Sequence, residues 1–174
     1  MLFPAGPPEA PGPRMCLELD TSGGGLPRVL WSGLAATGYP SPGGVPVAAY
    51  GPGMPFLGEH AHGRYTRPHL RGHRISHDGT PAGLAWTTRF TTDDLALTDR
   101  FLRLTAVDEH AGLSLRMEFE SVVGGSLRGR CAVTNTDPTP YVVEGLEVVL
   151  PVADDLVEVL DFTGRHEREL QCVP

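Results

Sequence analysis

The second half of the chain alternates between hydrophobic and polar residues with a period of two. In Leu113–Glu120, the residues Leu113, Leu115, Met117 and Phe119 fall on one face, and Phe101–Val107 alternates in the same way. A period of two is typical of β-strands that turn one face toward a core. Further strands are predicted at Cys16–Leu19, Pro27–Trp31, Leu127–Thr134 and Tyr141–Val149.

Turn signals separate these predicted strands. Gly23–Gly25, Gly124–Gly125 and Asn135–Pro138 carry residues that favour tight turns, and Pro151 ends the last regular strand. No stretch shows a convincing helical period, and Ser41–Gly63 is predicted to be loop. The chain is therefore expected to be all-β, an antiparallel β-sandwich with one polar face on its strands. Near the end, Glu158–Leu160 is predicted to finish a strand, and Asp161–Gly164 is predicted to be a turn.

Composition supports many short strands in one domain. The 174 residues include 22 Gly and 17 Pro, well above the average share of about 12% for these two residues. Pro-rich residues 1–15 are expected to be a flexible lead-in, residues 16–170 the sandwich, and residues 171–174 a truncated tail. The start has no basic segment followed by an apolar run, and no apolar run approaches the ~20 residues of a membrane span. A cytoplasmic location is expected.

Charge and cysteine content exclude several functions. The formal net charge is -7, which argues against nucleic-acid and anionic membrane surfaces as partners, because both require a basic face. All fourteen basic residues are Arg. Cys16, Cys131 and Cys172 are odd in number and far apart, so we expect reduced thiols.

Candidate catalytic groups are sparse. His60 and His62 would lie on one side of a strand, but their segment is predicted to be loop and the histidines match no zinc spacing, so no metal and no cofactor is expected. The acidic pairs are expected at turns, with adjacent carboxylates pointing apart, which disfavours a glycosidase pair. They are Asp93–Asp94, Asp108–Glu109 and Asp154–Asp155. A phosphate-binding loop and a nucleophile elbow are both absent from the sequence.

A basic segment, Gly58–Arg74, allows two interpretations. Its Arg side chains and its tyrosine are of the kinds that recognise sugar hydroxyls and ring faces. The same composition fits an exposed basic loop on an acidic protein. Both interpretations stay open on the residues alone.

Four stretches carry a family resemblance. They are Arg67–Arg74 (RPHLRGHR), Thr87–Asp94 (TTRFTTDD), Val133–Tyr141 (VTNTDPTPY) and Val148–Glu169 (VVLPVADDLVEVLDFTGRHERE). In order and spacing they resemble the N-terminal domain of bacterial family 36 glycoside hydrolases, the α-galactosidases, from about Leu17 to Leu170. The resemblance implies a β-supersandwich of the galactose mutarotase-like type. In that family a catalytic (β/α)₈ barrel and a small β-domain follow, and Asp161–Arg165 resembles the exit from the sandwich to the barrel.

The resemblance also implies that this chain holds no catalytic residue. The family's nucleophile lies in a Lys-Trp-Asp motif of the barrel, whereas this chain has no Lys, and neither Trp31 nor Trp86 precedes an Asp. The expected function is a non-catalytic module that contributes to carbohydrate binding, to the active-site mouth and to subunit packing. The chain alone is expected to be inactive.

The resemblance assigns the sugar contacts to the loop Gly63–His73. The residues expected to bind carbohydrate, weakly and as α-galactosides, are Tyr65, Arg67, Arg71 and His73. The expected macromolecular partners are the catalytic barrel or further subunits. An apolar patch that seats against the barrel is expected from Leu156, Val157, Val159, Leu160 and Phe162.

Two other functions remain open. One is a free-standing carbohydrate-binding β-sandwich protein that uses the same face. The other is a mutarotase-like sugar epimerase, which needs a His and a Glu that converge on a concave sheet face. The sequence shows no such pair at a spacing that indicates one.

Overall fold

The computed structural model describes residues 1–4, 14–35, 45–46, 53–62, 66–150, 161–165 and 168–173. These residues form strands and one short 3₁₀ helix, and they contain no α-helix, which confirms the predicted all-β class. Within this part of the chain, no helix is long and apolar enough to cross a membrane. The elements are β1 (Leu2–Phe3), β2 (Arg14–Asp20), β3 (Arg28–Ala35), β4 (Val45–Pro46), β5 (Met54–Pro55), η2 (His60–His62), β6 (Leu70–Arg74), β7 (Thr91–Leu97), β8 (Phe101–Asp108), β9 (Leu113–Ser121), β10 (Leu127–Asn135), β11 (Tyr141–Leu146), β12 (Asp161–Arg165) and β13 (Arg168–Val173).

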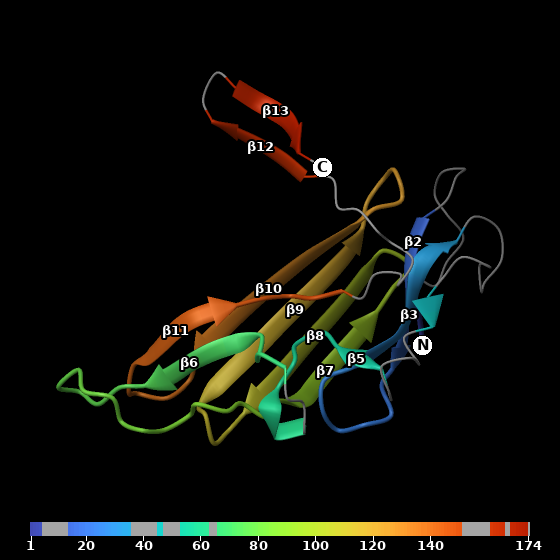
Figure 1. Cartoon of the computed structure of the whole chain (residues 1–174). Helices are drawn as coiled ribbons and strands as arrows, with labels where there is room; N and C mark the ends of the chain where they lie inside the picture. Colours follow the sequence, from blue (N-terminus) through green and yellow to red (C-terminus); the bar gives the residue numbers. More distant parts are fainter. Residues whose placement is uncertain are drawn as a thin grey trace.

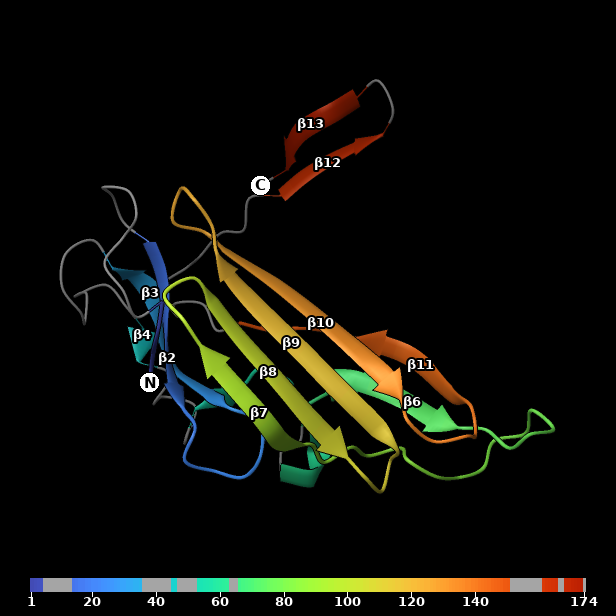
Figure 2. The ribbon, with the colours of Figure 1, turned by 180° about the vertical axis from the view of Figure 1, so that it is seen from behind.

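Every strand pair that the described residues form is antiparallel, as predicted. One sheet has the order β10-β9-β8-β7, and a second has the order β1-β2-β3-β4 with β5 also on β3. Two further pairs are β11-β6 and β12-β13. The two views show the β7–β10 sheet with the β2–β3 sheet near one of its ends and the β6–β11 pair toward the other (Figures 1 and 2).

The hydrophobic core lies on the inner face of the β7–β10 sheet. Leu113, Leu115, Met117 and Phe119 are each at most 1% exposed, as the period of two in β9 predicts. They cluster with Leu17, Leu19 and Val29 of the β2–β3 sheet. Phe119 stacks on Phe56 with the ring centroids 4.6 Å apart. Burying such a side chain contributes about 1.5–3 kcal/mol, so this shared core holds the two sheets together.

Arg74, at the end of β6, fixes the β6–β11 pair to the rest of the fold. Its guanidinium is almost completely buried and donates hydrogen bonds to backbone carbonyls of Ala111, Gly112 (2.8 Å) and Thr139 (2.6 Å). It also donates to the side chain of Asn135 at 2.9 Å. The Arg74 side chain therefore joins the β8–β9 turn to the segment between β10 and β11. The predicted turn at Asn135–Pro138 supplies one of its hydrogen-bond acceptors, Asn135.

Three predicted elements differ from the structure. Asp93–Asp94 lie inside β7 and not at a turn, and Asp161–Gly164 lie inside β12 and not at a turn. His60–His62, in the predicted loop Ser41–Gly63, form a 3₁₀ helix. The physical reason is the same for the two strands: antiparallel backbone pairing, with β8 and with β13 respectively, overrides the local turn preference of Asp and Gly.

Both boundaries predicted for the sandwich fall inside strands. Leu2–Phe3 pair with Leu17 and Glu18 of β2, and the expected boundary between residues 15 and 16 falls within β2. The boundary between residues 170 and 171 falls within β13. The expected apolar patch lies outside the described side chains, since residues 151–160 are not among the described residues and Phe162 is described only as part of β12.

Candidate functional site

The predicted carbohydrate residues lie on and just before β6. Arg71 and His73 alternate with the buried residues Leu70, Gly72 and Arg74, so their side chains leave β6 on the side away from the core. Arg67 is exposed in the segment that leads into β6. Tyr65 lies outside the described residues. The structure thus brings two of the four predicted residues onto one face.

Arg71 is held in place by an acidic partner on the neighbouring segment. Its Nη1 donates to Glu147 Oε1 at 2.8 Å and, at 3.4 Å, to the carbonyl oxygen of Pro68. The hydrogen bond from Arg71 lowers the pKa of the Glu147 carboxyl. Gly145 leaves room for this guanidinium, because a Cβ at that position would lie 2.0 Å from Arg71 Nη2 and would displace the side chain.

His73 stacks on an exposed tryptophan. The rings of His73 and Trp86 are 4.5 Å apart between centroids and 15° from parallel, and Trp86 is 53% exposed. His73 Nδ1 lies 3.3 Å from Glu144 Oε1. We call the set Arg71, His73, Trp86, Glu144 and Glu147 the β6–β11 face. Trp86 was not among the predicted site residues, although a tryptophan in a polar segment between strands is a signal that sequence reasoning can use.

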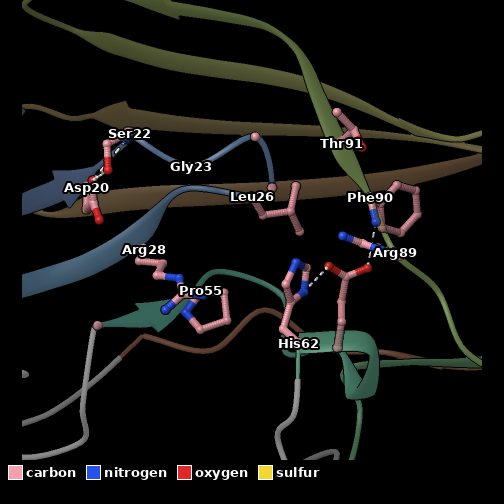
Figure 3. A pocket seen from close by; sticks show the side chains of 14 residues that line it. Asp20, Ser22, Gly23, Leu26, Arg28, Pro55, His62, Arg89, Phe90 and Thr91 are labelled. Atoms are coloured by element: carbon pink, nitrogen blue, oxygen red, sulfur yellow. Dashed lines mark hydrogen bonds and ion pairs between the residues drawn. The ribbon is translucent and has the colours of Figure 1, made fainter.

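A pocket of about 640 Å³ forms a second candidate site. It lies between the β2–β3 loop, β5, η2 and the start of β7. Figure 3 shows Asp20 and Ser22 toward one end, Arg89 and Phe90 toward the other, and Arg28, Pro55 and His62 along one side. Its lining residues are Asp20, Ser22, Gly23, Gly24, Gly25, Leu26, Arg28, Gly53, Pro55, Glu59, His62, Arg89, Phe90 and Thr91.

Glu59 is the buried carboxyl group of this pocket. Its side chain is 1% exposed, and its Oε1 accepts a 2.9 Å hydrogen bond from the Phe90 N–H. Its Oε2 lies 3.2 Å from His62 Nδ1 but accepts no hydrogen bond from the described residues. Burial raises the pKa of Glu59 to about 7, against the opposing effect of the Phe90 N–H. Burial also lowers the pKa of His62, so His62 is mainly neutral at pH 7.

The Glu59–His62 contact is a Glu–His pair that the sequence analysis did not identify. A 3₁₀ helix places residues i and i+3 above one another, which brings these two side chains together. The pair comes from a short turn at the pocket wall and not from a concave sheet face. The sequence predicts only a loop at Ser41–Gly63, and a loop prediction does not say which of its side chains meet.

The other candidate groups of the sequence analysis do not form a further site among the described residues. Asp108 is buried and accepts hydrogen bonds from the N–H groups of Arg89 (2.7 Å) and Ala111 (2.9 Å), which fixes the β8–β9 turn. Asp154–Asp155 lie outside the described residues. Among the described residues, no group of three or more His, Cys, Asp or Glu could hold a metal ion. Cys16 and Cys131 are free thiols, and burial raises the pKa of both.

Comparison with known proteins covers the β6–β11 face and the part of the pocket wall from Gly53 onward. The family model of the glycosyl hydrolase family 36 N-terminal domain matches residues 53–173. An alpha-galactosidase of Escherichia coli is 36% identical over 118 residues, which are 68% of this chain and 16% of that protein. The chain therefore spans less than a fifth of the length of this relative. No solved structure gives a significant match.

Proposed function

Because this chain belongs to the glycosyl hydrolase family 36 N-terminal domain family, we propose that it serves as the non-catalytic β-module of an α-galactosidase-related protein. In this role it contributes carbohydrate contacts beside the active-site mouth. It also contributes a packing surface for a catalytic barrel or for further subunits. A cytoplasmic location remains a prediction.

The observation that carries the carbohydrate role is the β6–β11 face. Trp86 offers an exposed aromatic plane already stacked on His73, and sugar rings pack their C–H faces on such planes. Arg71 offers guanidinium donors that Glu147 holds in one orientation. Aromatic and planar polar groups side by side are what a sugar ring with several hydroxyl groups requires.

The non-catalytic role follows from the chemistry of glycoside cleavage. A retaining glycosidase needs two carboxyl groups about 5–5.5 Å apart, one ionised and one protonated. Of the described carboxyl groups, Glu59 has its pKa raised to about 7. Glu144 and Glu147, on the β6–β11 face, are each about half exposed. We therefore expect binding, without bond cleavage, from this chain.

An activity assay tests the non-catalytic role. The purified 174-residue chain is incubated with an aryl α-galactoside, and release of the aryl group is followed. We expect no turnover above the uncatalysed rate. Turnover that disappears in Glu59→Gln, the acidic residue best placed to act as an acid, would overturn the proposal and make the chain an enzyme.

A titration tests the carbohydrate contact. Trp86 is exposed and Trp31 is 5% exposed, so added D-galactose should change mainly the fluorescence of Trp86. We expect an affinity no better than about millimolar, since an open face encloses little of a ligand. Arg71→Ala should weaken it at least about tenfold, because a charge-assisted hydrogen bond contributes about 1.5–3 kcal/mol.

Arg116→Ala is the matched control for this titration. Arg116 is an exposed arginine of β9, on the side of the β7–β10 sheet away from the core. Its loss should leave the affinity unchanged. If both variants weakened the affinity for galactose equally, the cause would be the change in net charge. The β6–β11 face would then no longer be assigned as the carbohydrate contact.

The two alternatives predict other results. A free-standing carbohydrate-binding protein should bind galactose much more tightly than millimolar without a barrel. A sugar epimerase is favoured by the Glu59–His62 contact, and it should accelerate the mutarotation of α-D-galactose in a polarimeter. We do not expect tight binding, because the open β6–β11 face encloses little of a ligand. We do not expect faster mutarotation either, because the side chains of Glu59 and His62 approach the pocket from one short turn and contact each other.

A further inference from the structure

We propose that the pocket beside Glu59 and His62 is a second binding site, for a neutral polyhydroxylated molecule of monosaccharide size. It does not depend on the β6–β11 face, since the two sites share no residue.

The enclosure suits a small organic ligand. Small-molecule sites generally measure about 300–1,000 Å³, and this pocket measures about 640 Å³. Leu26, Pro55 and Phe90 supply apolar wall, and Phe90 is completely buried. Segments distant in sequence supply the remaining wall, so the folded chain as a whole forms the pocket (Figure 3).

The polar groups select a ligand that both donates and accepts hydrogen bonds. Glu59 Oε2 is a buried oxygen for which the described residues supply no hydrogen bond of normal geometry, although a hydrogen bond with the Thr88 side chain contributes to the pKa of Glu59. A ligand hydroxyl that donates to Oε2 would satisfy this oxygen. The same hydroxyl, or its neighbour, can accept from Arg89 or His62, because each hydroxyl group has one donor and two acceptor positions.

The charges disfavour an anion. Arg28 and Arg89 line the pocket, but the carboxyl groups of Asp20 and Glu59 line it too. A phosphate or carboxylate would face the ionised Asp20 and the Glu59 carboxyl, whose pKa of about 7 leaves it partly charged, and like charges at close range in a partly buried site are unfavourable. A neutral ligand meets the donors and the acceptors without this repulsion.

The walls of the pocket are held in place before a ligand arrives. Thr92 donates from its N–H to Gly24 O at 3.1 Å and from Oγ1 to Gly25 O at 2.9 Å, which ties the β2–β3 loop to β7. Ser22 donates to Asp20 Oδ1 from its N–H and from its hydroxyl. A Cβ on Gly25 would approach His62 Nε2 to 3.1 Å, so glycine there leaves room for the imidazole. Such preorganisation reduces the entropy that binding would otherwise lose.

The test is a titration of the full chain, followed by the backbone amide signals in nuclear magnetic resonance. The probes are D-galactose and myo-inositol as neutral polyols and inorganic phosphate as the anion. We expect both polyols to shift the amide signals of Gly24, Gly25 and Phe90. Phosphate should not shift them. Signals of Gly72 and Val142 on β6 and β11 report the other site separately, so failure of one site is distinguished from failure of the other.

Two histidines of the same turn give matched variants. His62→Ala should weaken the polyol-induced shifts at the pocket at least about tenfold, which corresponds to about 1.4 kcal/mol. His60→Ala should leave them unchanged, because His60 Nε2 contacts the Thr66 carbonyl oxygen and does not line the pocket. Shifts from phosphate, no shift from either polyol, or equal effects of the two variants would each overturn the proposal.

Discussion

Arg71 and Arg74 are three positions apart on β6 and have opposite roles. Arg74 is buried and donates to three backbone carbonyls, whereas Arg71 faces outward and pairs with one half-exposed carboxylate. A lysine can replace neither the planar shape nor the several fixed donors of a guanidinium. The two arginines should therefore respond very differently to the same substitution.

Arg74→Lys should lower the free energy of unfolding by at least about 2 kcal/mol, because it leaves buried carbonyls without donors. Arg71→Lys is the matched control and should cost less than about 1 kcal/mol, as exposed ion pairs do. Urea unfolding followed by circular dichroism measures both. Equal losses for the two variants would contradict the structural role of Arg74.

Glu59 should make stability depend on pH. Its pKa is about 7 in the folded chain, against 4.5 for an ordinary glutamate, so the folded state binds more protons between these values. The contribution of Glu59 to the free energy of unfolding should be highest below about pH 4.5, fall as pH rises toward 7 and level off above it, by up to roughly 3 kcal/mol. Glu59→Gln should remove this fall. Urea midpoints from pH 5 to pH 8 that run parallel for the two proteins would contradict it.

The sequence predicts the residue roles on β6 only in part. Arg and His occupy both faces of this strand, since Arg74 is buried while Arg71 and His73 are not. Alternation of polarity therefore cannot separate the structural arginine from the outward residues. The partner of His73 is equally hidden, because Trp86 lies thirteen positions away and the stacking depends on how the segment after β6 folds back.

At the scale of elements, β9 has one buried face, which includes Met117, and one face with charged residues, which includes Arg116. Met117→Asp should lower the free energy of unfolding by about 3 kcal/mol or more, because it buries a charge without a partner. Arg116→Asp introduces the same side chain on the exposed face, opposite Thr105 and Ala132, and should change stability by about 0.5 kcal/mol or less. Thermal unfolding of both variants is the measurement. A helix-dominated circular dichroism spectrum of the parent chain would contradict the fold itself.

Prediction of elements succeeds where one face is buried and the other is solvated. Phe101–Val107 and Leu127–Thr134 each agree with the structure to within one residue, because alternation is visible in such strands. It fails at β7, whose inward residues are only half-buried and whose alternation is interrupted by a bulge between Thr92 and Asp94. β7 is an edge strand of its sheet, and the charges of Asp93 and Asp94 discourage it from pairing with another sheet. The acidic pair that the sequence predicts at a turn therefore protects a sheet edge.

At the scale of the whole molecule, the inner face of β10 is covered less well than that of β9. Leu127, Cys131 and Val133 are only partly buried, while Leu115 and Met117 opposite them are completely buried. On β11, Val142 is 36% and Val143 is 51% exposed. Apolar surface of this kind is typical of a module that packs against another domain.

The isolated chain should therefore self-associate as its concentration rises, which sedimentation velocity measures. Val143→Lys should reduce the association, because it places a charge on the exposed apolar surface of β11. Val123→Lys, in the β9–β10 turn where Val123 is 84% exposed, is the control and should not reduce it. A monomer at every concentration would count against packing through this surface.

The buried position of Arg74 has a consequence for local motion. The β8–β9 turn and the segment after β10 share one cation, and the Thr136 N–H also donates to the Gly112 carbonyl at 2.9 Å. Neither segment can open without breaking contacts of the other, so both should behave as one cooperative unit. In hydrogen–deuterium exchange, the amides of Ala111 and Thr136 should then become labelled at closely similar rates, although twenty-five positions of sequence separate them.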